Sequence, residues 1–253
     1  MSQLTGRVAI VTGGGQGIGQ GVALCLARAG ANVVINDTNQ ERITQTVNQA
    51  QAFGVQSLGV IADVRRSTDV NRLVQEAVSR FGKVDILINN AGVVVVKSMD
   101  KQTETDWDNV IDVNLKGVFL CCHQVVQEMI KQKQGAIVNI ASIAAFHYTV
   151  PHVPYAASKA GVVALTRDLA YEVARHGIRV NAIAPGPIET PMMSSALTPQ
   201  QKEAYAQQVP LGRLGQPQDI GNAAVFLCSD EASFVTGVTL PVSGGTDLRV
   251  STS

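Results

Sequence analysis

Tyr155 and Lys159, four residues apart, are the pair in this sequence whose side-chain types and spacing best suit chemistry. In a helix, residues four apart share one face, so both side chains would reach the same space. A phenol is a weak acid, and a neighbouring ammonium favours its anion, which makes proton exchange with a carbonyl or alkoxide oxygen easier. The alternative is structural, with a half-buried ring beside a solvated lysine. The surrounding elements must decide between the two interpretations.

Apolar, β-branched runs alternate with helix-period segments along the chain. The runs predict buried strands at 7–12, 32–36, 55–62, 84–89, 136–141, 178–184 and 237–242. The segments between them predict helices at 17–29, 40–53, 67–81, 107–131, 154–175 and 218–227, the third with a Ser-Thr-Asp cap. Such alternation implies a parallel sheet with right-handed crossovers. We therefore expect one α/β domain, residues 1–253, with a Rossmann-type, doubly wound parallel sheet in a three-layer α/β/α arrangement.

A polar segment, 189–208, breaks the alternation after a Pro-Gly-Pro turn. It is rich in methionine and glutamine. A polar insert of this length between regular elements is typical of an active-site loop, so we interpret it as a mobile cover over a substrate site.

Composition argues against several classes of partner. Lysine plus arginine equals aspartate plus glutamate, at 20 each, so neither nucleic acid nor an anionic membrane is an expected partner. Four cysteines and four histidines show no metal-ligand spacing, so we expect no metal and a reducing cytoplasmic compartment. The longest stretch without charge, 134–158, is interrupted by polar residues and prolines, so we expect no membrane span. The N-terminus does not resemble a secretory signal.

A glycine-rich segment, Thr12-Gly13-Gly14-Gly15-Gln16-Gly17-Ile18-Gly19, follows the first predicted strand and opens the first helix. Glycines there allow a tight turn and a close backbone approach to a pyrophosphate, and the helix N-terminus favours the anion. A strand-to-helix turn without a ligand is the alternative. The contacts that we expect come from Gly13, Gln16, Gly17, Ile18 and Gly19.

Asp37 ends the second predicted strand, where this fold places its ribose-reading acid. A carboxylate there can accept both adenosine hydroxyls and would repel a 2′-phosphate. Since no lysine or arginine lies at 13–19 or 37–40, we expect NAD rather than NADP, although Arg42 is close in sequence. Capping the next helix is a competing role for Asp37, and the two roles are compatible.

Two further strand ends carry candidate cofactor contacts. Asp63, followed by Val64, can hydrogen-bond the adenine amine or cap the next helix. After the fourth strand, Asn90, Ala91 and Gly92 allow close backbone approach, and their amides can bridge strands. Asn89, just before them, fits a structural role.

Together these motifs resemble the classical short-chain dehydrogenase/reductase family over essentially the whole chain. The resemblance rests on the order of TGGGQGIG, Asp63, NNAG, Ser142, YAASK and Pro185-Gly186. It implies a catalytic tetrad of Asn114, Ser142, Tyr155 and Lys159. Tyr155 would exchange the proton, Ser142 would bind the same substrate oxygen, and Lys159 would hold the nicotinamide ribose. Asn114 would support a water leading to the lysine; its structural alternative is a kink in the predicted helix.

The resemblance also implies contacts and assembly beyond the tetrad. Pro185, Gly186, Ile188 and Thr190 would contact the nicotinamide carboxamide, and a plain proline-glycine turn is the alternative. Ser243 departs from the family pattern, which usually has aspartate before Gly244-Gly245. The family is commonly tetrameric, so we expect a homotetramer in which the helices at 107–131 and 154–175 pack across one interface.

These expectations converge on an NAD-dependent oxidoreductase that interconverts a secondary alcohol and a ketone. Its substrate would be small, neutral and largely apolar, bound by Ser142, Tyr155, Val94, Ala144, His147 and His152. The alternatives are an enzyme resembling 3-oxoacyl-carrier reductases, whose usual NADPH preference Asp37 opposes, and a non-catalytic dinucleotide-binding regulatory protein. Ala144 opposes the 3-hydroxybutyrate dehydrogenases of the family, because those enzymes have histidine there.

Overall fold

A parallel β-sheet forms the centre of the molecule. The computed structural model describes residues 3–194 and 198–248, and in these the sheet has seven strands in the order β3-β2-β1-β4-β5-β6-β7. The strands are β1 (Val8–Thr12), β2 (Asn32–Asp37), β3 (Ser57–Ile61), β4 (Ile86–Asn89), β5 (Gly135–Ile140), β6 (Ile178–Pro185) and β7 (Thr239–Val242). The order reverses between β1 and β4, where open α/β sheets bind ligands at the carboxyl ends of the strands. The predicted Rossmann-type fold is confirmed.

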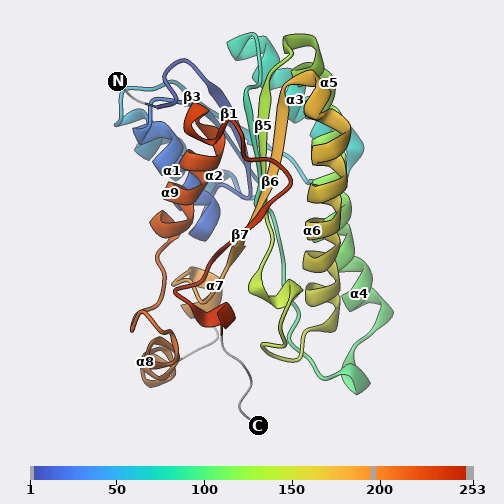
Figure 1. The fold of residues 1–253 in the computed structure, drawn as a ribbon, viewed down its shortest axis with the longest axis vertical. Helices are drawn as coiled ribbons and strands as arrows, with labels where there is room; N and C mark the ends of the chain where they lie inside the picture. Colours follow the sequence, from blue (N-terminus) through green and yellow to red (C-terminus); the bar gives the residue numbers. More distant parts are fainter. Residues whose placement is uncertain (1–2, 195–197, 249–253) are drawn as a thin grey trace.

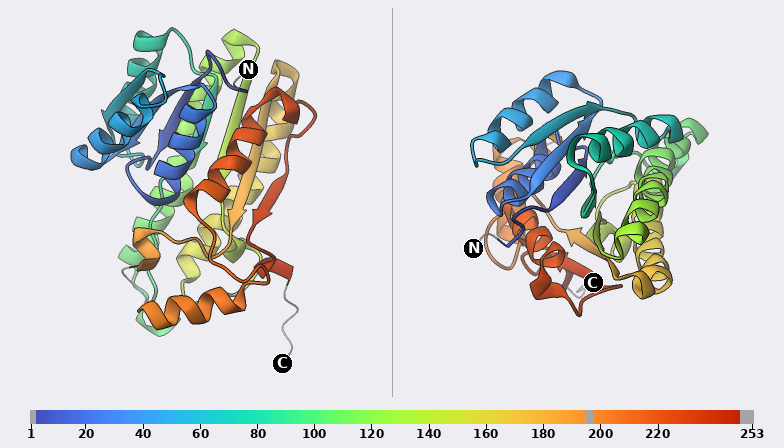
Figure 2. Two further views of the ribbon diagram at one scale, coloured as in Figure 1. Left: turned by 90° about the vertical axis from the view of Figure 1, so that its left-hand side faces the viewer. Right: turned by 90° about the horizontal axis from the view of Figure 1, so that it is seen from above.

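Helices cover both faces of the sheet (Figures 1 and 2). One face carries α1 (Gly17–Arg28), α2 (Gln40–Gln51) and α9 (Pro217–Cys228). The other carries α3 (Ser67–Phe81), α5 (Gly117–Gln132) and α6 (Val153–Val173). Successive residues of β1 alternate between the faces: Val8 and Ile10 pack with the second group, and Ala9 and Val11 with the first. Burial on both faces explains why the strands read as unbroken apolar runs.

Three buried polar side chains tie α6 to the sheet. Asn89 Nδ2 donates to Asn139 Oδ1 at 2.8 Å, and Asn139 Nδ2 donates to Thr166 Oγ1 at 2.9 Å. All three residues are buried. A hydrogen-bonded polar chain in an apolar interior has one low-energy register, because a slip would leave donors unpaired. The chain therefore sets how far along the sheet α6 places Tyr155 and Lys159, and Asn89 has the predicted structural role.

The predicted helix at 107–131 consists of three consecutive pieces. These are α4 (Glu104–Ile111), a π-helical turn (Asp112–Lys116) and α5. It begins three residues earlier than predicted, because Thr103 and Asp106 form a reciprocal capping box. The π turn contains Asn114 and is the local irregularity that an asparagine in mid-helix suggested. Single π turns are frequent at functional sites.

The start of α3 differs from the prediction. The N-cap residue is Arg66, whose side chain makes no capping hydrogen bond, so the Ser-Thr-Asp cap is wrong. Asp69 Oδ2 instead accepts a hydrogen bond from the backbone of Asp63 at 3.0 Å. The helix start is therefore fixed by a bond back to the strand end that precedes it.

The segment predicted as a cover lies beyond the carboxyl ends of the strands (Figure 1). It forms the short helix α7 (Pro191–Ser194) and α8 (Pro199–Gln208), with residues 195–197 of the predicted segment outside the described part. Thr198 and Gln201 close a capping box at the start of α8. Short 3₁₀ turns occur at Met99–Lys101, Ile143–Ala145, Ala174–His176, Asp230–Ala232 and Thr246–Leu248. Among the described helices, none is both long and apolar enough to cross a bilayer.

Candidate active site

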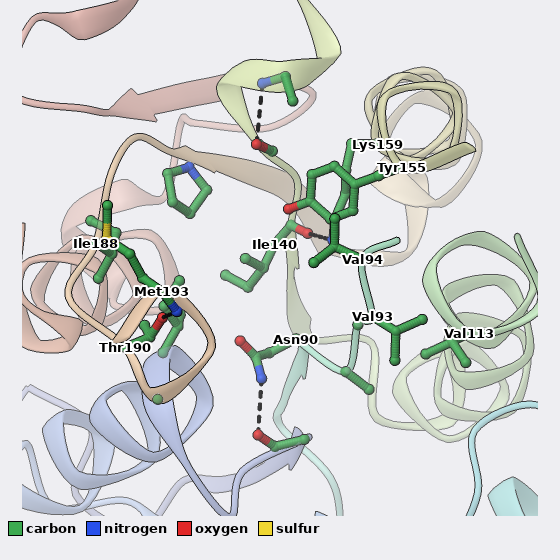
Figure 3. A pocket seen from close by; sticks show the side chains of 18 of the residues that line it. Asn90, Val93, Val94, Val113, Ile140, Tyr155, Lys159, Ile188, Thr190 and Met193 are labelled. Carbon is green, nitrogen blue, oxygen red and sulfur yellow. Dashed lines mark hydrogen bonds between the residues drawn. The ribbon is translucent and has the colours of Figure 1, made fainter. Parts of the chain in front are cut away.

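A cavity of about 900 Å³ opens at the carboxyl ends of the strands. Most of the residues predicted for the site line it (Figure 3). They are Gly13, Gln16, Gly17, Ile18, Asp37, Asp63, Val64, Asn90, Ala91, Gly92, Val94, Ser142, Ala144, His152, Tyr155, Lys159, Pro185, Gly186, Ile188 and Thr190. Gly19, Asn114 and His147 do not line it. The cavity is large enough for a cofactor and a small substrate together.

The glycine loop is held from two neighbouring strands. Asn90 Nδ2 donates to the carbonyls of Thr12 and Gly13, at 3.0 Å each, and Gly14 N donates to Asn36 O at 2.8 Å. Gly13 has φ +61°, and a Cβ on it would lie 2.9 Å from Ala91 Cα. The loop therefore presents bare backbone and the N–H groups of the first turn of α1, which lack partners within the helix. This arrangement fits a pyrophosphate.

Gly19 has a packing role in the glycine loop. A Cβ on Gly19 would lie 2.2 Å from Gly13 O and 2.3 Å from Asn90 Nδ2. The residue thus sits behind the loop, where α1 crosses it, and is absent from the cavity wall. Its missing side chain allows the loop and Asn90 to meet.

Asp37 organises the ribose end of the cavity. Its Oδ2 accepts from Gly15 N at 3.2 Å, and its Oδ1 accepts from Thr38 N at 2.8 Å. The N-cap of α2 is Asn39, whose Oδ1 accepts from Arg42 N at 3.0 Å, so Asp37 is not the helix cap. Arg42, in the first turn of α2, also lines the cavity. A carboxylate and a guanidinium therefore both border this end.

Asp63 has a partner that sequence reasoning missed. Arg65 Nη2 lies 2.7 Å from Asp63 Oδ2, and Arg65 Nε is 3.0 Å from both carboxylate oxygens. The hydrogen bond from Arg65 lowers the pKa of Asp63. Both residues line the cavity, so an adenine amine would share Asp63 with Arg65. Asp63 does not cap α3, whose N-cap is Arg66.

Tyr155 and Lys159 lie in the first turns of α6 and face the end of β5 (Figure 3). Lys159 is 4% exposed, its Nζ donates to Ile140 O at 2.7 Å, and the same Nζ lies 5.6 Å from the centre of the Tyr155 ring. Burial lowers the pKa of Lys159 to about 8, because the interior disfavours its charge. The helical pairing predicted from the sequence is present.

The pKa of Tyr155 is raised, mainly by burial, and a hydrogen bond with Ser142 offsets part of this. We expected the ammonium to favour the phenolate, yet desolvation of the phenol has the larger effect here. Ser142 follows β5, and its Oγ also accepts from Ala144 N at 3.1 Å. Ser142 therefore closes the turn at the end of β5 and also hydrogen-bonds Tyr155. As a result, the hydroxyl groups of Ser142 and Tyr155 lie together at one point of the cavity.

Asn114 is fully buried behind the cavity wall. Its Oδ1 accepts from Val93 N at 2.8 Å, and its Nδ2 donates to Val93 O at 2.9 Å and to Ser158 Oγ at 3.2 Å. A Cβ on Gly92 would lie 3.4 Å from Asn114 Oδ1 and 3.7 Å from Lys159 Nζ. The bare glycine thus leaves an open position between the amide and the lysine.

One of the two histidines predicted for the substrate pocket lies in it. His152 Nε2 is 2.8 Å from Thr149 Oγ1, and its ring centre is 5.1 Å from that of Tyr155. Burial lowers the pKa of His152, which keeps the ring neutral at pH 7. His147 is exposed and outside the wall, because the chain leaves the pocket after the 3₁₀ turn Ile143–Ala145. The wall also includes three residues that sequence reasoning did not assign to the site, Asn109, Val113 and Thr246.

No group of three or more metal-binding side chains occurs in the described part of the chain. The cavity offers organic groups for proton transfer: a phenol, a hydroxyl and an ammonium around one point. The glycine loop, Asp37 and Asp63 lie along the other end of the same cavity.

Comparisons with known proteins agree with this geometry. A family model described as enoyl-(acyl carrier protein) reductase matches residues 13–247. The chain is 45% identical to hydroxy(phenyl)methylsuccinyl-CoA dehydrogenase subunit BbsD of Thauera aromatica, over 96% of this chain and 97% of that one. It is 42% identical to the 3-oxoacyl-acyl-carrier-protein reductase of Staphylococcus epidermidis, over 94% and 98%.

Solved structures show the same similarity. A 7α-hydroxysteroid dehydrogenase, solved with NADH and 7-oxo glycochenodeoxycholic acid, has a TM-score of 0.92 at 40% identity, over 96% of this chain and 95% of that one. Levodione reductase has a TM-score of 0.94 at 35% identity, over 98% and 100%. With its glycine loop, Ser142, Tyr155 and Lys159 in one cavity, the chain belongs to the classical short-chain dehydrogenase/reductase family of oxidoreductases that act on carbonyls with a nicotinamide dinucleotide.

Proposed function

We propose that the protein is an NAD-dependent oxidoreductase that interconverts a secondary alcohol and a ketone. The observation that carries the proposal is the common cavity, in which Ser142, Tyr155 and Lys159 border one end and the glycine loop and Asp37 the other. A binding protein without turnover would not need a buried phenol, hydroxyl and ammonium at one point.

The side chains divide the chemistry between them. Tyr155 gives its phenolic proton to the carbonyl oxygen in reduction and recovers one from the alcohol in oxidation. Ser142 donates a hydrogen bond to the same oxygen and holds it beside Tyr155. A nicotinamide dinucleotide held by the glycine loop, Asp37 and Lys159 would supply the hydride donor in reduction and the hydride acceptor in oxidation. Lys159 supplies positive charge next to the phenol, where it favours the phenolate during turnover.

Asn114 would complete the proton path as a positioning residue. Its Oδ1 and Lys159 Nζ border the open position beside Gly92. A small hydrogen-bonding group there can contact both atoms, which would connect the lysine to the interior.

Asp37 supports the choice of NAD. Its carboxylate lines the cavity at the end of β2, where it can accept the ribose hydroxyls and would repel a 2′-phosphate. Arg42 and Arg65 border the same end, but Arg65 is already paired with Asp63. The ratio of kcat/KM for NAD and NADP measures this preference directly.

The lining supports a small, neutral, largely apolar substrate. The apolar side chains of Val93, Val94, Val96 and Ile143 line the cavity, and Lys159 is the charged group beside Tyr155. Of the similar solved structures, one is named for a 7α-hydroxysteroid and holds a 7-oxo bile acid, and another is named for levodione. A 3-oxoacyl thioester is the second candidate, since two relatives above 40% identity are named for thioester substrates.

A substrate panel with a tyrosine variant tests the function. The panel contains cyclohexanol, 1-phenylethanol, a 7-hydroxysteroid and a 3-hydroxyacyl thioester, each with NAD and NADP, and NADH absorbance is the readout. Tyr155→Phe should lower turnover by about 100- to 10,000-fold, because general acid–base catalysis is lost, and should bind NADH as the unchanged protein does. Equal turnover in the variant would contradict the mechanism. NADH binding without turnover of any alcohol or ketone would support the non-catalytic alternative.

We also propose a homotetramer. Phe119 on α5 and Tyr171 on α6 are 53% and 91% exposed, and Phe234, before β7, is fully exposed. Large apolar side chains on two separate faces fit two kinds of subunit contact. Light scattering at micromolar concentration should give four times the chain mass, and a monomer would refute the proposal.

A further inference from the structure

The turn after β7 is built around the side chain of Ser243. Ser243 Oγ accepts from Gly245 N at 3.1 Å and donates to Asp247 Oδ1. Ser243 O accepts from Thr246 Oγ1 at 2.8 Å. Gly244 and Gly245 have φ of +64° and +88°, a backbone that the glycines accept without strain. One serine thus holds the residues of the turn in place.

The outer side of this turn packs on residues 209–211, which follow α8. Leu211 N donates to Gly244 O at 3.2 Å. A Cβ on Gly244 would lie 2.6 Å from Val209 Cγ1, and one on Gly245 would lie 3.2 Å from Pro210 Cβ. A shift of the turn would therefore move the backbone that follows α8.

The inner side packs on the segment after β6. A Cβ on Gly186 would lie 2.7 Å from Ser243 Cα, and Gly186 N donates to Val242 O at 3.1 Å. Ser243 is consequently fixed between the Pro-Gly-Pro turn and residues 209–211, which follow α8. Thr246 and Val209, on either side of this contact, both line the cavity.

We propose that the Ser243–Asp247 hydrogen bond positions one wall of the substrate pocket. In this role Ser243 and Asp247 are positioning residues, and Thr246, together with Val209, determines which substrates fit. The inference rests on the proposed oxidoreductase function for its kinetic part. A serine can donate to the carboxylate of Asp247, whereas two carboxylates at these positions would repel each other.

The first experiment does not depend on turnover. Hydrogen exchange over residues 199–211 is compared between the unchanged full-length protein, Ser243→Ala and Asp247→Asn. Each variant removes one partner of the Ser243–Asp247 hydrogen bond, which holds the turn against Leu211. Backbone hydrogen exchange over residues 199–211 should therefore become about 3- to 10-fold faster. Asp230→Asn is the matched control, because Asp230 is 85% exposed at the opposite end of the sheet and pairs with Arg7. Unchanged exchange in both turn variants would overturn the proposal.

The second experiment exchanges the two side chains. Ser243→Asp alone should raise KM for the best alcohol of the panel at least about tenfold, through repulsion by Asp247. The double variant Ser243→Asp with Asp247→Ser restores one donor and one carboxylate, so KM should return to within about twofold of the unchanged protein. The NADH dissociation constant and kcat should change less than twofold, which a general loss of folding would not allow.

The outcomes separate the inference from the proposed function. If the unchanged protein turns over no alcohol, the proposed function fails, and the exchange rates over 199–211 still decide the role of the turn. If it turns over an alcohol and the double variant stays as impaired as Ser243→Asp, the pairing is not what positions the wall. If Thr246→Val leaves the ranking of panel substrates unchanged, Thr246 does not determine specificity.

Discussion

The two ends of the cavity are built in opposite ways. At the cofactor end, side chains such as Asn90 and Asp37 hydrogen-bond the backbone of the glycine loop. At the substrate end, the wall comes from loops and short helices, and its outer neighbours include Tyr148 and Leu211, which are 83% and 73% exposed. The cofactor end is therefore fixed by hydrogen bonds from neighbouring strand ends of the sheet, whereas the substrate end depends on contacts between loops and short helices outside the sheet. Rigidity concentrates at the first end, and specificity at the second.

The largest expected effect tests the rigidity of the cofactor end. Gly19→Ala would place a Cβ 2.2 Å from Gly13 O, so the loop or Asn90 must move. Because overpacking costs about 1–3 kcal/mol, NADH affinity should fall up to about 100-fold. Gly54→Ala is the control, since it has φ +78° but no atom within 4 Å of the added Cβ. It should lose about 1 kcal/mol of stability and keep its NADH affinity. Equal losses of affinity would show that loop packing is not the cause.

The second effect concerns the free-energy cost of burying Lys159. Below pH 8 the lysine is protonated in both the folded and unfolded states, whereas above it the folded protein has released the proton and the unfolded chain still holds it until about pH 10.5. The stability of the unchanged protein should therefore rise with pH through this window.

Lys159→Met lacks this group, so its stability should not rise in the same way. The difference in free energy of unfolding between Lys159→Met and the unchanged protein should fall by about 2–3 kcal/mol between pH 7 and pH 10. Urea unfolding at both pH values measures this difference. Tyr155 is present in both proteins, so its contribution to the free energy of unfolding cancels in the difference. A difference that is independent of pH would mean that burial does not disfavour the charge of Lys159.

The third effect concerns cofactor choice at Asp37. Asp37→Ser removes the carboxylate that would repel a 2′-phosphate and leaves Arg42 beside it. Since the site is open to solvent, the ratio of kcat/KM for NADP over NAD should rise about tenfold. Asp37→Ser with Arg42→Ala should lose most of that gain. A ratio unaffected by Asp37→Ser would refute the proposed basis of NAD preference.

The same contrast explains what the sequence could predict. Tyr155 and Lys159 could be placed because helical spacing is local, and Asp37 could be placed because a strand end fixes it. Asn39 caps α2 in preference to Asp37, because the cap depends on where the first helical turn begins.

Long-range contacts could not be read in this way. The Ser243 turn, for example, meets Leu211 over a separation of about thirty residues in sequence. The loop carrying His147 and His152 is held by a bond from Lys97 N to Pro151 O at 2.9 Å, from a segment more than fifty residues earlier. Nothing in the local pattern of that loop distinguishes the inward histidine from the outward one.

The smallest expected effect compares those two histidines. His152→Phe keeps a ring beside Tyr155 but loses the bond to Thr149, so KM for the best alcohol should change about fivefold, as one hydrogen bond is worth about 1 kcal/mol. His147→Phe should change KM less than twofold, because His147 is exposed and outside the cavity wall. Burial lowers the pKa of His152, so its ring is neutral and the effect of His152→Phe should be the same at pH 7 and pH 8.5. Equal effects of the two variants would mean that the loop rearranges when substrate binds, and the substrate end would then be adaptable where the cofactor end is fixed.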